Sequence, residues 1–374
     1  MRRYGLDWLR VIVVFLLFPF HTARIFDKWE PNYIKDATSE FSSWLVASLG
    51  FWFMALLFVI AGYSAYSALR KRSPREYMDE RIKRLLIPLV MGIVLIVPVQ
   101  GFVASLQHEG FTGGYFEYLG RFFTDFSDIS GYTGGFTPAH LWFILYLFII
   151  SACLLPLLIK LKNKPSRISD AWLLAPAFFV MTVAEAVPGI GGKNIVFYAV
   201  LFLYGFLIAR SDTAMETIRR LRFAALAGAL VLCPLYLFAA SSLGWPDGIN
   251  PLAAGIALLR NLSVWLIIIA LMGIADTYLR KPSPVLSYLN LASFPVYVLH
   301  QSVMMIIAYY VVAMDLSPAA KFIAIMLASL AACLALYELC RRLSPTRFIL
   351  GIKKGRFGVS HQSNDPAATI ADKE

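Results

Sequence analysis

The chain has 374 residues, of which 59% are hydrophobic and only 15% are charged, and its mean hydropathy is +0.67. Soluble domains carry about 25% charged residues, so these values exclude an ordinary cytosolic enzyme, a disordered chain and a secreted disulfide-rich scaffold. The apolar residues lie in long blocks, and a bilayer core requires runs of roughly 20 apolar residues. The sequence therefore predicts an all-α, polytopic integral membrane protein.

The net charge of +11 would suggest a nucleic-acid partner in a soluble chain. In a membrane protein, the distribution of positive charge along the chain matters more than its sum. The four cysteines all lie in apolar runs and form neither a disulfide framework nor a CxxC pattern. We therefore expect no nucleic-acid partner and no metal site.

Ten windows of about 19 residues are apolar enough to cross a membrane. Arg2 and Arg3 precede the first window, but no small-residue cleavage site follows it, so we expect it to remain as a span. Two windows are weak, because 172–187 is short and contains Glu185 and because 194–209 follows it after only a Pro- and Gly-containing turn. The predicted spans are 8–26, 43–68, 85–106, 141–159, 172–187, 194–209, 223–240, 251–275, 288–312 and 319–340.

The lysines and arginines between these windows support the arrangement. Alternate connecting segments hold 26 basic residues on one side and 4 on the other, and the side rich in Lys and Arg is the cytoplasmic one. We therefore predict about ten transmembrane helices in a cell inner membrane, with both termini in the cytoplasm. Residues 1–352 are expected to form one transmembrane domain, and the polar segment 353–374 a disordered cytoplasmic tail.

The longest connection, 107–140, is predicted to lie outside and contains seven glycines and nine aromatic residues. A long Gly-rich loop is either a functional lid or an irregular connector. Its aromatic residues are more typical of an interfacial belt than of sugar-stacking platforms.

The first span contains three ionisable residues, Asp7, Arg10 and His21. Such residues are costly inside a membrane and indicate function by default. Arg10 and His21 are eleven residues apart, which places them within about 20° of one azimuth and roughly 16 Å apart along a helix. Asp7 lies one turn before Arg10 and can pair with it. The alternatives are that Arg10 reaches the lipid headgroups and that His21 only packs between helices, but their shared face favours function.

A second basic signature, RIKRLLIP at 81–88, begins the third span. Arg81 and Arg84 are three residues apart and are expected to face the same way. Two guanidinium groups placed like this can bind phosphates with paired hydrogen bonds. The alternative is that they only contribute positive charge that keeps this segment in the cytoplasm.

These motifs resemble the acyltransferase 3 family of integral membrane proteins. LDWLR with a histidine eleven residues after its arginine is similar to that family's first span, FVIAGYSAY at 58–66 to its second, and RIKRLLIP to the beginning of its third. HLWFILYL, YLNLASFPVYVLHQSV and LYELCRR follow in the expected order. The chain most resembles the branch of this family that succinylates periplasmic glucans.

The resemblance implies an enzyme that moves a succinyl or acetyl group from cytoplasmic acyl-CoA to a hydroxyl of a glucan or another cell-envelope glycan. Acyl-CoA would be its donor substrate, and no permanently bound cofactor is expected. His21 would act as the general base, which is a role suited to a side chain that titrates near neutrality. Arg10, held by Asp7, would orient the thioester, and His300 would belong to the same catalytic group.

The resemblance also implies binding residues. Arg81 and Arg84 would hold the phosphates of coenzyme A, and His140 and Trp142 of HLWFILYL would lie at the substrate site. The sequence departs from the family pattern at Ala61, where many members have Ser, so a hydroxyl role is not carried over there. It departs again after His300, where the glucan branch often has a second histidine and this chain has Gln.

Two other classes of function fit the residues. A transporter or flippase for an anionic glycolipid or sugar would use Arg10, His21 and Arg260 to line a pathway. A haem or quinone protein would use paired histidines such as His21 and His300 at matching depths. The sequence contains no Walker loop, HExxH or GxSxG motif, so it gives no support to an ATPase, a zinc protease or an α/β-hydrolase.

Overall fold

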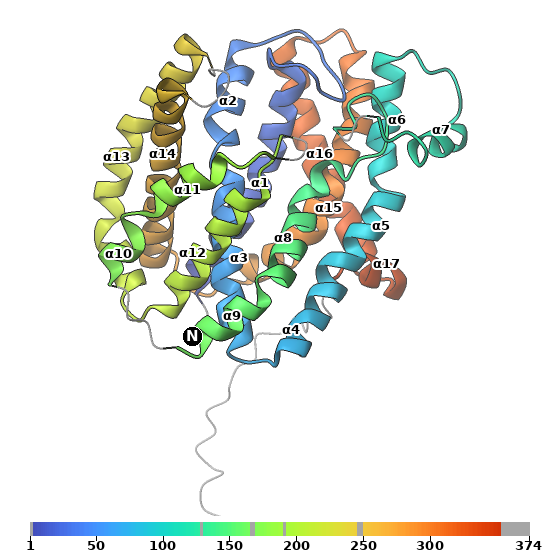
Figure 1. Ribbon diagram of the computed structural model, residues 1–374. Coiled ribbons are helices and arrows are strands. Elements are labelled where there is room, and N and C mark those ends of the chain that lie inside the picture. Colours follow the sequence, from blue (N-terminus) through green and yellow to red (C-terminus); the bar gives the residue numbers. More distant parts are fainter. Residues whose placement is uncertain (1–2, 128–129, 165–168, 190–191, 245–249, 353–374) are drawn as a thin grey trace, which may run out of the picture.

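The structure is a computed structural model that describes residues 3–127, 130–164, 169–189, 192–244 and 250–352. Within these ranges the chain forms helices and no β-strand (Figure 1), which confirms the predicted all-α class. The predicted tail, 353–374, lies outside the described residues.

Most elements are α-helices, but η1 is a π-helical turn and η2 a 3₁₀ turn. In chain order they are α1 (Tyr4–Phe26), α2 (Glu40–Gly50), α3 (Phe53–Leu69), α4 (Pro74–Arg81), η1 (Ile82–Leu86), α5 (Ile87–Leu95), α6 (Val97–His108), α7 (Tyr115–Phe122), η2 (Ala139–Leu141), α8 (Trp142–Cys153), α9 (Leu155–Lys162), α10 (Asp170–Leu174), α11 (Ala177–Glu185), α12 (Ile195–Arg210), α13 (Ala214–Leu243), α14 (Pro251–Tyr278), α15 (Pro284–Val312), α16 (Pro318–Cys340) and α17 (Ser344–Ile349).

Each of the ten predicted windows contains helix, but only some of these helices are long and apolar enough to cross a membrane. Seven meet that test among the described residues, and an eighth is added if η2–α8 and α9, bent by 57°, count as one span. The weak window 172–187 is divided into the short helices α10 and α11, and α12 has only 16 residues. The structure therefore shows a helical protein with several candidate spans and does not confirm the count of ten.

Prolines explain several of the breaks. Pro88 has no N–H to donate, and its ring crowds the carbonyl one turn earlier. The preceding turn accordingly widens into η1, where the backbone N–H of Ile87 bonds the carbonyl of Ile82. Pro98 is the second residue of α6 and Pro156 the second residue of α9, so the third and fourth predicted spans are built of shorter helices.

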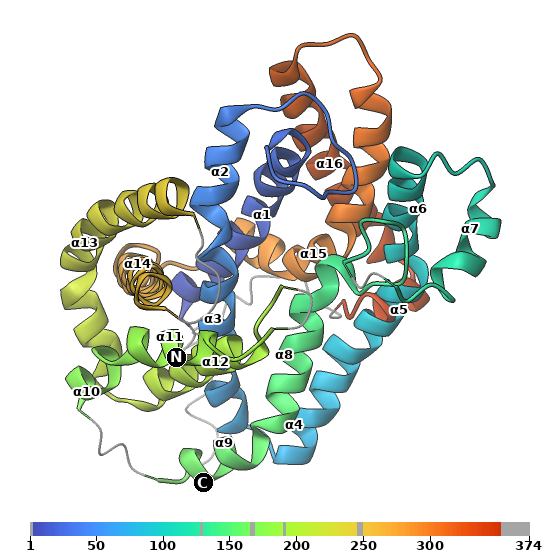
Figure 2. The ribbon, with the colours of Figure 1, turned by 45° about the horizontal axis from the view of Figure 1, so that its top comes forward.

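Helix α1 runs through the middle of the bundle (Figure 1) and contacts α2, α3, α14, α15 and α16. Figure 2 shows α13 and α14 side by side at one edge of the bundle, where they pack against each other. Helix α1 therefore brings residues near the start of the chain into contact with residues of α14, α15 and α16, which lie more than two hundred residues later.

The segments rich in Lys and Arg meet at one end of the bundle. A cavity of about 940 Å³ at the start of α1 is lined by basic side chains from four of these segments: Arg3, Arg70, Lys71, Arg219 and Arg280. Lys162 of a fifth segment bonds the carbonyl of Leu69, and Arg347 of the sixth lines a smaller hollow beside Arg84. We call this the basic end. The predicted alternation of segments thus agrees with the structure, while the side of the membrane that each end faces stays a prediction.

The opposite end of α1 is covered by the connection 27–39, which folds back over the helix terminus (Figure 1), and we call it the capped end. The long Gly-rich connection 107–140 contains α7, which lies beside the bundle and has a small core of its own. Tyr118 and Phe122 are fully buried there, and the Tyr118 hydroxyl donates a hydrogen bond to the carbonyl of Gly134 at 2.5 Å. At least these two aromatic residues are packing residues rather than members of an exposed belt.

Candidate functional site

The predicted pairing on α1 is confirmed. Arg10 donates a hydrogen bond to the carboxylate of Asp7 at 3.2 Å, and it also donates to the Asn290 amide oxygen and to the Ser64 hydroxyl, each at 3.2 Å. These partners come from α1 itself, α15 and α3. The Arg10 side chain is 32% exposed, so it is held in place between three helices without being sealed off.

His21 lies against the same neighbouring helix as Arg10. Its ring centroid is 5.1 Å from that of His300 on α15, just as Arg10 meets Asn290 ten residues earlier on α15. Helices α1 and α15 therefore run side by side in the same direction, and the polar face predicted for α1 points at α15.

Three histidines meet where α1, α15 and η2 come together. The ring of His300 lies between those of His21 and His140, with centroids 5.1 Å and 5.0 Å away. His300 is fully buried and His140 nearly so, while His21 is half-buried. Sequence reasoning had considered His21 with His300 but had placed His140 only at a substrate site, so the trio is a finding of the structure. We call these three residues the histidine cluster.

The hydrogen bonds of the histidine cluster fix two of its tautomers. Nδ1 of His300 lies 2.6 Å from the carbonyl oxygen of Tyr297, and Nε2 of His140 lies 2.9 Å from that of Val298. Since a carbonyl can only accept, each of these nitrogens carries its proton. The other nitrogen of each neutral ring then has a free lone pair, and within the described part of the chain neither one has a hydrogen-bond partner.

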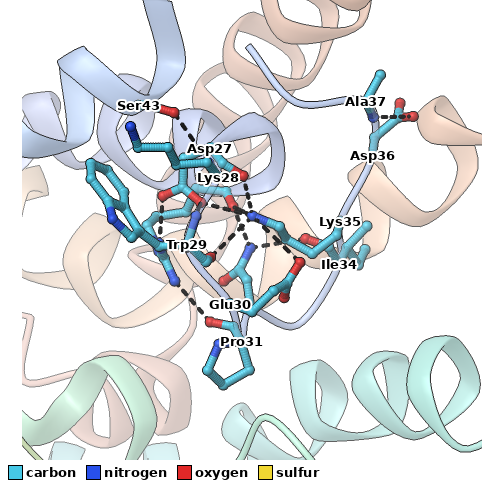
Figure 3. Close-up of polar contacts among 12 residues, drawn as sticks. Asp27, Lys28, Trp29, Glu30, Pro31, Ile34, Lys35, Asp36, Ala37 and Ser43 are labelled. Atoms are coloured by element: carbon cyan, nitrogen blue, oxygen red, sulfur yellow. Dashed lines mark hydrogen bonds and ion pairs between the residues drawn. The ribbon is translucent and has the colours of Figure 1, made fainter. Parts of the chain in front are cut away.

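A compact polar loop closes the capped end next to this cluster (Figure 3). The carboxylate of Asp27 is fully buried, accepts a bond from Lys35 Nζ at 2.7 Å and pairs with Arg24 of the last turn of α1. Lys35 also donates to the carbonyl of Trp29 at 3.1 Å, and Asn32 donates to that of Arg24 at 3.1 Å. These hydrogen bonds and ion pairs hold the connection over the end of α1, close to His21.

Trp142, predicted at the substrate site, lies in a separate aromatic cluster. Its ring centroid is 5.1 Å from that of Tyr198 and 5.5 Å from that of Tyr146, and Lys193 Nζ lies 5.3 Å over its ring. Trp142 follows His140 by two residues, so the aromatic cluster and the histidine cluster are neighbours. Lys193 is a cation of the aromatic cluster that the sequence analysis does not select.

Arg81 and Arg84 both lie at the basic end, but their side chains contact different partners and do not line one hollow together. Arg81 lies over the ring of Tyr77 at 4.8 Å, and Arg84 pairs with Glu80 at 3.1 Å. The π-helical turn begins between them, so the α-helical spacing used to align them does not continue through Arg84. Arg84 lines a hollow with Lys83 and Arg347, and the residues that line this hollow do not include Arg81.

The structure identifies the ion-pair partner of Arg260, which the sequence does not. Arg260 pairs with the carboxylate of Glu185, whose other oxygen accepts a hydrogen bond from the Asn261 amide at 2.7 Å. This group joins α14 to α11 and does not include Arg10 or His21, so a pathway lined by all three has no support here. The described residues contain no group of three His, Cys, Asp or Glu side chains placed to hold a metal ion.

Two curated proteins resemble parts of the chain. Glucans biosynthesis protein C of Salmonella heidelberg (strain SL476) is 27% identical over 202 residues, which cover 50% of this chain and 48% of that protein. The protein of the same name from Escherichia coli (strain SMS-3-5 / SECEC) is 26% identical over 168 residues, or 44% and 40% of the two chains. The chain thus aligns with less than half the length of these relatives. No solved structure matches it.

The family comparison covers much more. Residues 3–338 match the acyltransferase domain that defines the acyltransferase 3 family. This range includes α1 with Arg10 and His21, the large cavity of the basic end and the whole histidine cluster. The match spans nearly all of the described helices, and it confirms the resemblance seen in the motifs. The chain therefore belongs to the acyltransferase 3 family.

Proposed function

We propose that this protein is a membrane O-acyltransferase that uses acyl-CoA as donor and a glycan hydroxyl as acceptor. The observation that carries the proposal is the histidine cluster, which lies on the same face of α1 as the anchored Arg10. A base and a fixed cation on one helix face suit acyl transfer from an anionic donor, because the base can remove the proton of the acceptor and the cation, further along the helix, can hold the donor by its negative charge.

His21 is the proposed general base, since it is the least buried member of the cluster. It accepts the proton of the acceptor hydroxyl while the hydroxyl oxygen bonds to the thioester carbonyl carbon. The carbon–sulfur bond then breaks, and the sulfur leaves as the thiol with the proton that His21 returns. His300 packs against the ring of His21 and is itself held by the Tyr297 carbonyl, so it acts as a positioning residue.

Arg10 orients the donor. It lies about 16 Å before His21 along α1, toward the basic end, and its three hydrogen bonds limit its motion. The acyl donor is proposed to approach from the basic end, with Arg81 and Arg84 as predicted contacts for its phosphates. The acceptor is proposed to approach from the capped end, past His140 and Trp142.

The acceptor class is proposed from the relatives. Both are named for glucan biosynthesis, so a hydroxyl of a glucan or a related envelope glycan is the proposed acceptor and succinyl or acetyl the proposed acyl group. The same reasoning proposes a multi-pass protein of the cell inner membrane, with the basic end in the cytoplasm.

The test is acyl transfer by the purified full-length protein, with acetyl-CoA or succinyl-CoA as donor and a periplasmic glucan as acceptor. His21→Ala is expected to lower the rate by roughly 10²–10⁴-fold, which is the usual contribution of a positioned base. His108→Ala is the matched control, because His108 is also a histidine near the capped end but bonds only the carbonyl of Asn32 among the contacts described for it. It should leave the rate within about twofold, as expected of a surface change.

A His21→Ala protein that is folded and fully active would contradict the assignment of the base. A wild-type protein that moves a glycolipid across vesicles without consuming acyl-CoA would instead favour the transporter. Donor consumption that depends on His21 would support the acyltransferase directly.

A further inference from the structure

The large cavity at the basic end has no role in the motif-based assignment. It measures about 940 Å³ and lies between the start of α1, the end of α3, the first turns of α13 and the end of α14. Its walls combine basic and tyrosine side chains with a single carboxylate, that of Asp276. The lining residues are Arg3, Tyr4, Gly5, Tyr63, Tyr66, Ser67, Arg70, Lys71, Ala209, Arg219, Asp276 and Arg280.

The charges in this cavity do not cancel. Asp276 is 7% exposed and is shared by Arg3 at 2.7 Å and Arg219 at 3.6 Å. Five basic side chains against one carboxylate leave the walls strongly positive. Arginine and lysine gathered around a cavity bind phosphate groups, because their N–H groups match phosphate oxygens in geometry and charge.

The tyrosines add a second kind of contact. The guanidinium of Arg3 lies 5.9 Å over the ring of Tyr63, and that of Arg70 lies 6.0 Å over the ring of Tyr66. A ring with an arginine beside it can stack on a nucleobase while the arginine meets the adjoining phosphate. The cavity therefore fits a ligand that joins a base to several phosphates better than it fits a single phosphate group.

The cavity also adjoins Arg10. Its walls include Tyr63 and Ser67 of α3, and Ser64 between them in the sequence holds Arg10. Gly5 lies in the wall on α1, two residues before Asp7, and a Cβ at Gly5 would come within 2.5 Å of the Ala275 carbonyl oxygen. Helices α1 and α14 are thus in close contact at one wall, and the α3 wall adjoins Ser64, the residue that holds Arg10.

We propose that the nucleotide end of the acyl-CoA donor binds in this cavity, with Arg3, Arg219 and Arg280 around its phosphates and Tyr63 or Tyr66 against its adenine. This inference rests on the proposed function and names the donor site for it. The flexible arm of the donor then points along α1, past Arg10 and toward His21, where the thioester reacts. Arg81 and Arg84 do not line this cavity, so they are predicted contacts of the donor outside it.

The experiment measures the affinity of coenzyme A for the detergent-purified full-length protein by calorimetry. Arg219→Gln is compared with Arg220→Gln, which is an unusually close control. The two arginines are neighbours on α13, both pair with Glu216, and only Arg219 lines the cavity. We expect Arg219→Gln to weaken binding by roughly tenfold or more, Arg220→Gln to leave it unchanged, and the affinity of the wild type to fall as salt is added.

Two further variants keep the test decisive. Ser67→Trp fills the cavity from the α3 side without removing a charge, and it should also weaken binding if its melting temperature shows that it folds. Arg347→Gln removes a cation from the smaller hollow of the basic end, outside this cavity, and should have little effect. Binding that is insensitive to Arg219→Gln and Ser67→Trp, or that is lost instead in Arg347→Gln, would overturn the inference while leaving the proposed function intact.

The other outcomes concern the ligand. Competition by anionic lipid vesicles as strong as that by coenzyme A, with no preference for coenzyme A over inorganic phosphate, would show a lipid-headgroup site and overturn the nucleotide assignment. If the wild type binds no coenzyme A at all, the proposed donor fails and the inference fails with it. Coenzyme A binding that persists in His21→Ala while acyl transfer is lost would support both.

Discussion

The two ends of α1 use charged residues in opposite ways. At the capped end, the buried carboxylate of Asp27 is enclosed by Arg24 and Lys35, and the hollow of about 420 Å³ beside the loop has one cation, Lys28, and one carboxylate, Glu40, in its lining. At the basic end, five cations surround about 940 Å³ of open space and share one carboxylate. The first arrangement satisfies its charges within the protein, and the second leaves them available to a ligand.

This difference indicates which charged residues stabilise the fold and which are available to bind a ligand. A buried and fully paired group is costly to break, because its partners are then left without compensation. An exposed or half-exposed group contributes little to stability, because water and salt screen it. Substitutions at the capped end should therefore unfold the protein, and those at the basic end should change its ligand affinity.

The largest expected effect on stability is that of Asp27→Asn. Removal of the buried carboxylate leaves Arg24 and Lys35 without their shared partner, so we expect a loss of about 3–5 kcal/mol in the free energy of unfolding. The melting temperature in detergent should fall accordingly. Glu30→Gln is the control, because Glu30 is 64% exposed and lies 3.9 Å from the same Lys35. A comparison in which both variants melt together with the wild type would break the contrast between the two ends.

Close helix packing between the ends gives the next effect. Gly62 on α3 and Gly205 on α12 face each other's backbones, and a Cβ at Gly62 would come within 1.8 Å of the Phe202 carbonyl oxygen. Gly62→Ala should cost about 1–3 kcal/mol through overpacking. Gly255→Ala in α14 is the control, because nothing lies within 4 Å of its Cβ position. That variant should be neutral or up to about 1 kcal/mol more stable, as checked by thermal melting.

Much of the fold was predictable because its signals are local. Each apolar window predicts a helix from its own residues alone. Helical periodicity likewise places Arg10 and His21 on one face of α1 and Asp7 next to Arg10, as the structure shows. The count of spans failed to be confirmed where local signals are weakest, at 172–187 and at the 16-residue α12. A hydropathy window cannot tell a full span from helices that stop inside the bundle.

The site was less predictable because it is made by packing. His21, His140 and His300 come from α1, η2 and α15, and only the tertiary arrangement brings the rings of His21 and His140 within about 5 Å of that of His300. The basic cavity likewise joins Arg3 to Arg219, more than two hundred residues later. The sequence signal that could have found it is the positive charge of four separate segments on one predicted side, which was used only for orientation.

A smaller effect is expected at the basic end. Arg280 follows the end of α14, is exposed and donates a hydrogen bond to the Asp276 carbonyl in the last turn of that helix at 2.5 Å. Arg280→Gln should change the free energy of unfolding by no more than about 0.5 kcal/mol. Its affinity for coenzyme A should nevertheless fall, measured by the same calorimetric titration. A variant with a lowered melting temperature and unchanged affinity would reverse the expected division between the two ends.

The smallest effect is a dependence of stability on pH in the long connection near the capped end. The pKa of Asp125 is lowered from its ordinary value of 3.8 by hydrogen bonds from the Ser127 hydroxyl at 2.6 Å and from the Ser127 backbone N–H at 3.0 Å. Because the folded protein favours the ionised form, Asp125 contributes stability at any pH above 3.8 and loses that contribution as the pH falls through its lowered pKa. Asp125→Asn should therefore melt slightly below the wild type at pH 7.

That difference should shrink as both proteins are acidified below pH 3.8, since protonation removes from the wild type what the substitution has already removed from the variant. Asp315→Asn is the control. It makes the same change of charge in the connection between α15 and α16, where the described residues offer the carboxylate no hydrogen bond, so it should melt with the wild type. A gap between Asp125→Asn and the wild type that stays constant with pH would mean that the substitution acts by packing. The charge of Asp125 would then not stabilise its loop, in contrast to the buried charge of Asp27. A surface carboxylate stabilises its loop through its charge only while it is ionised and hydrogen-bonded.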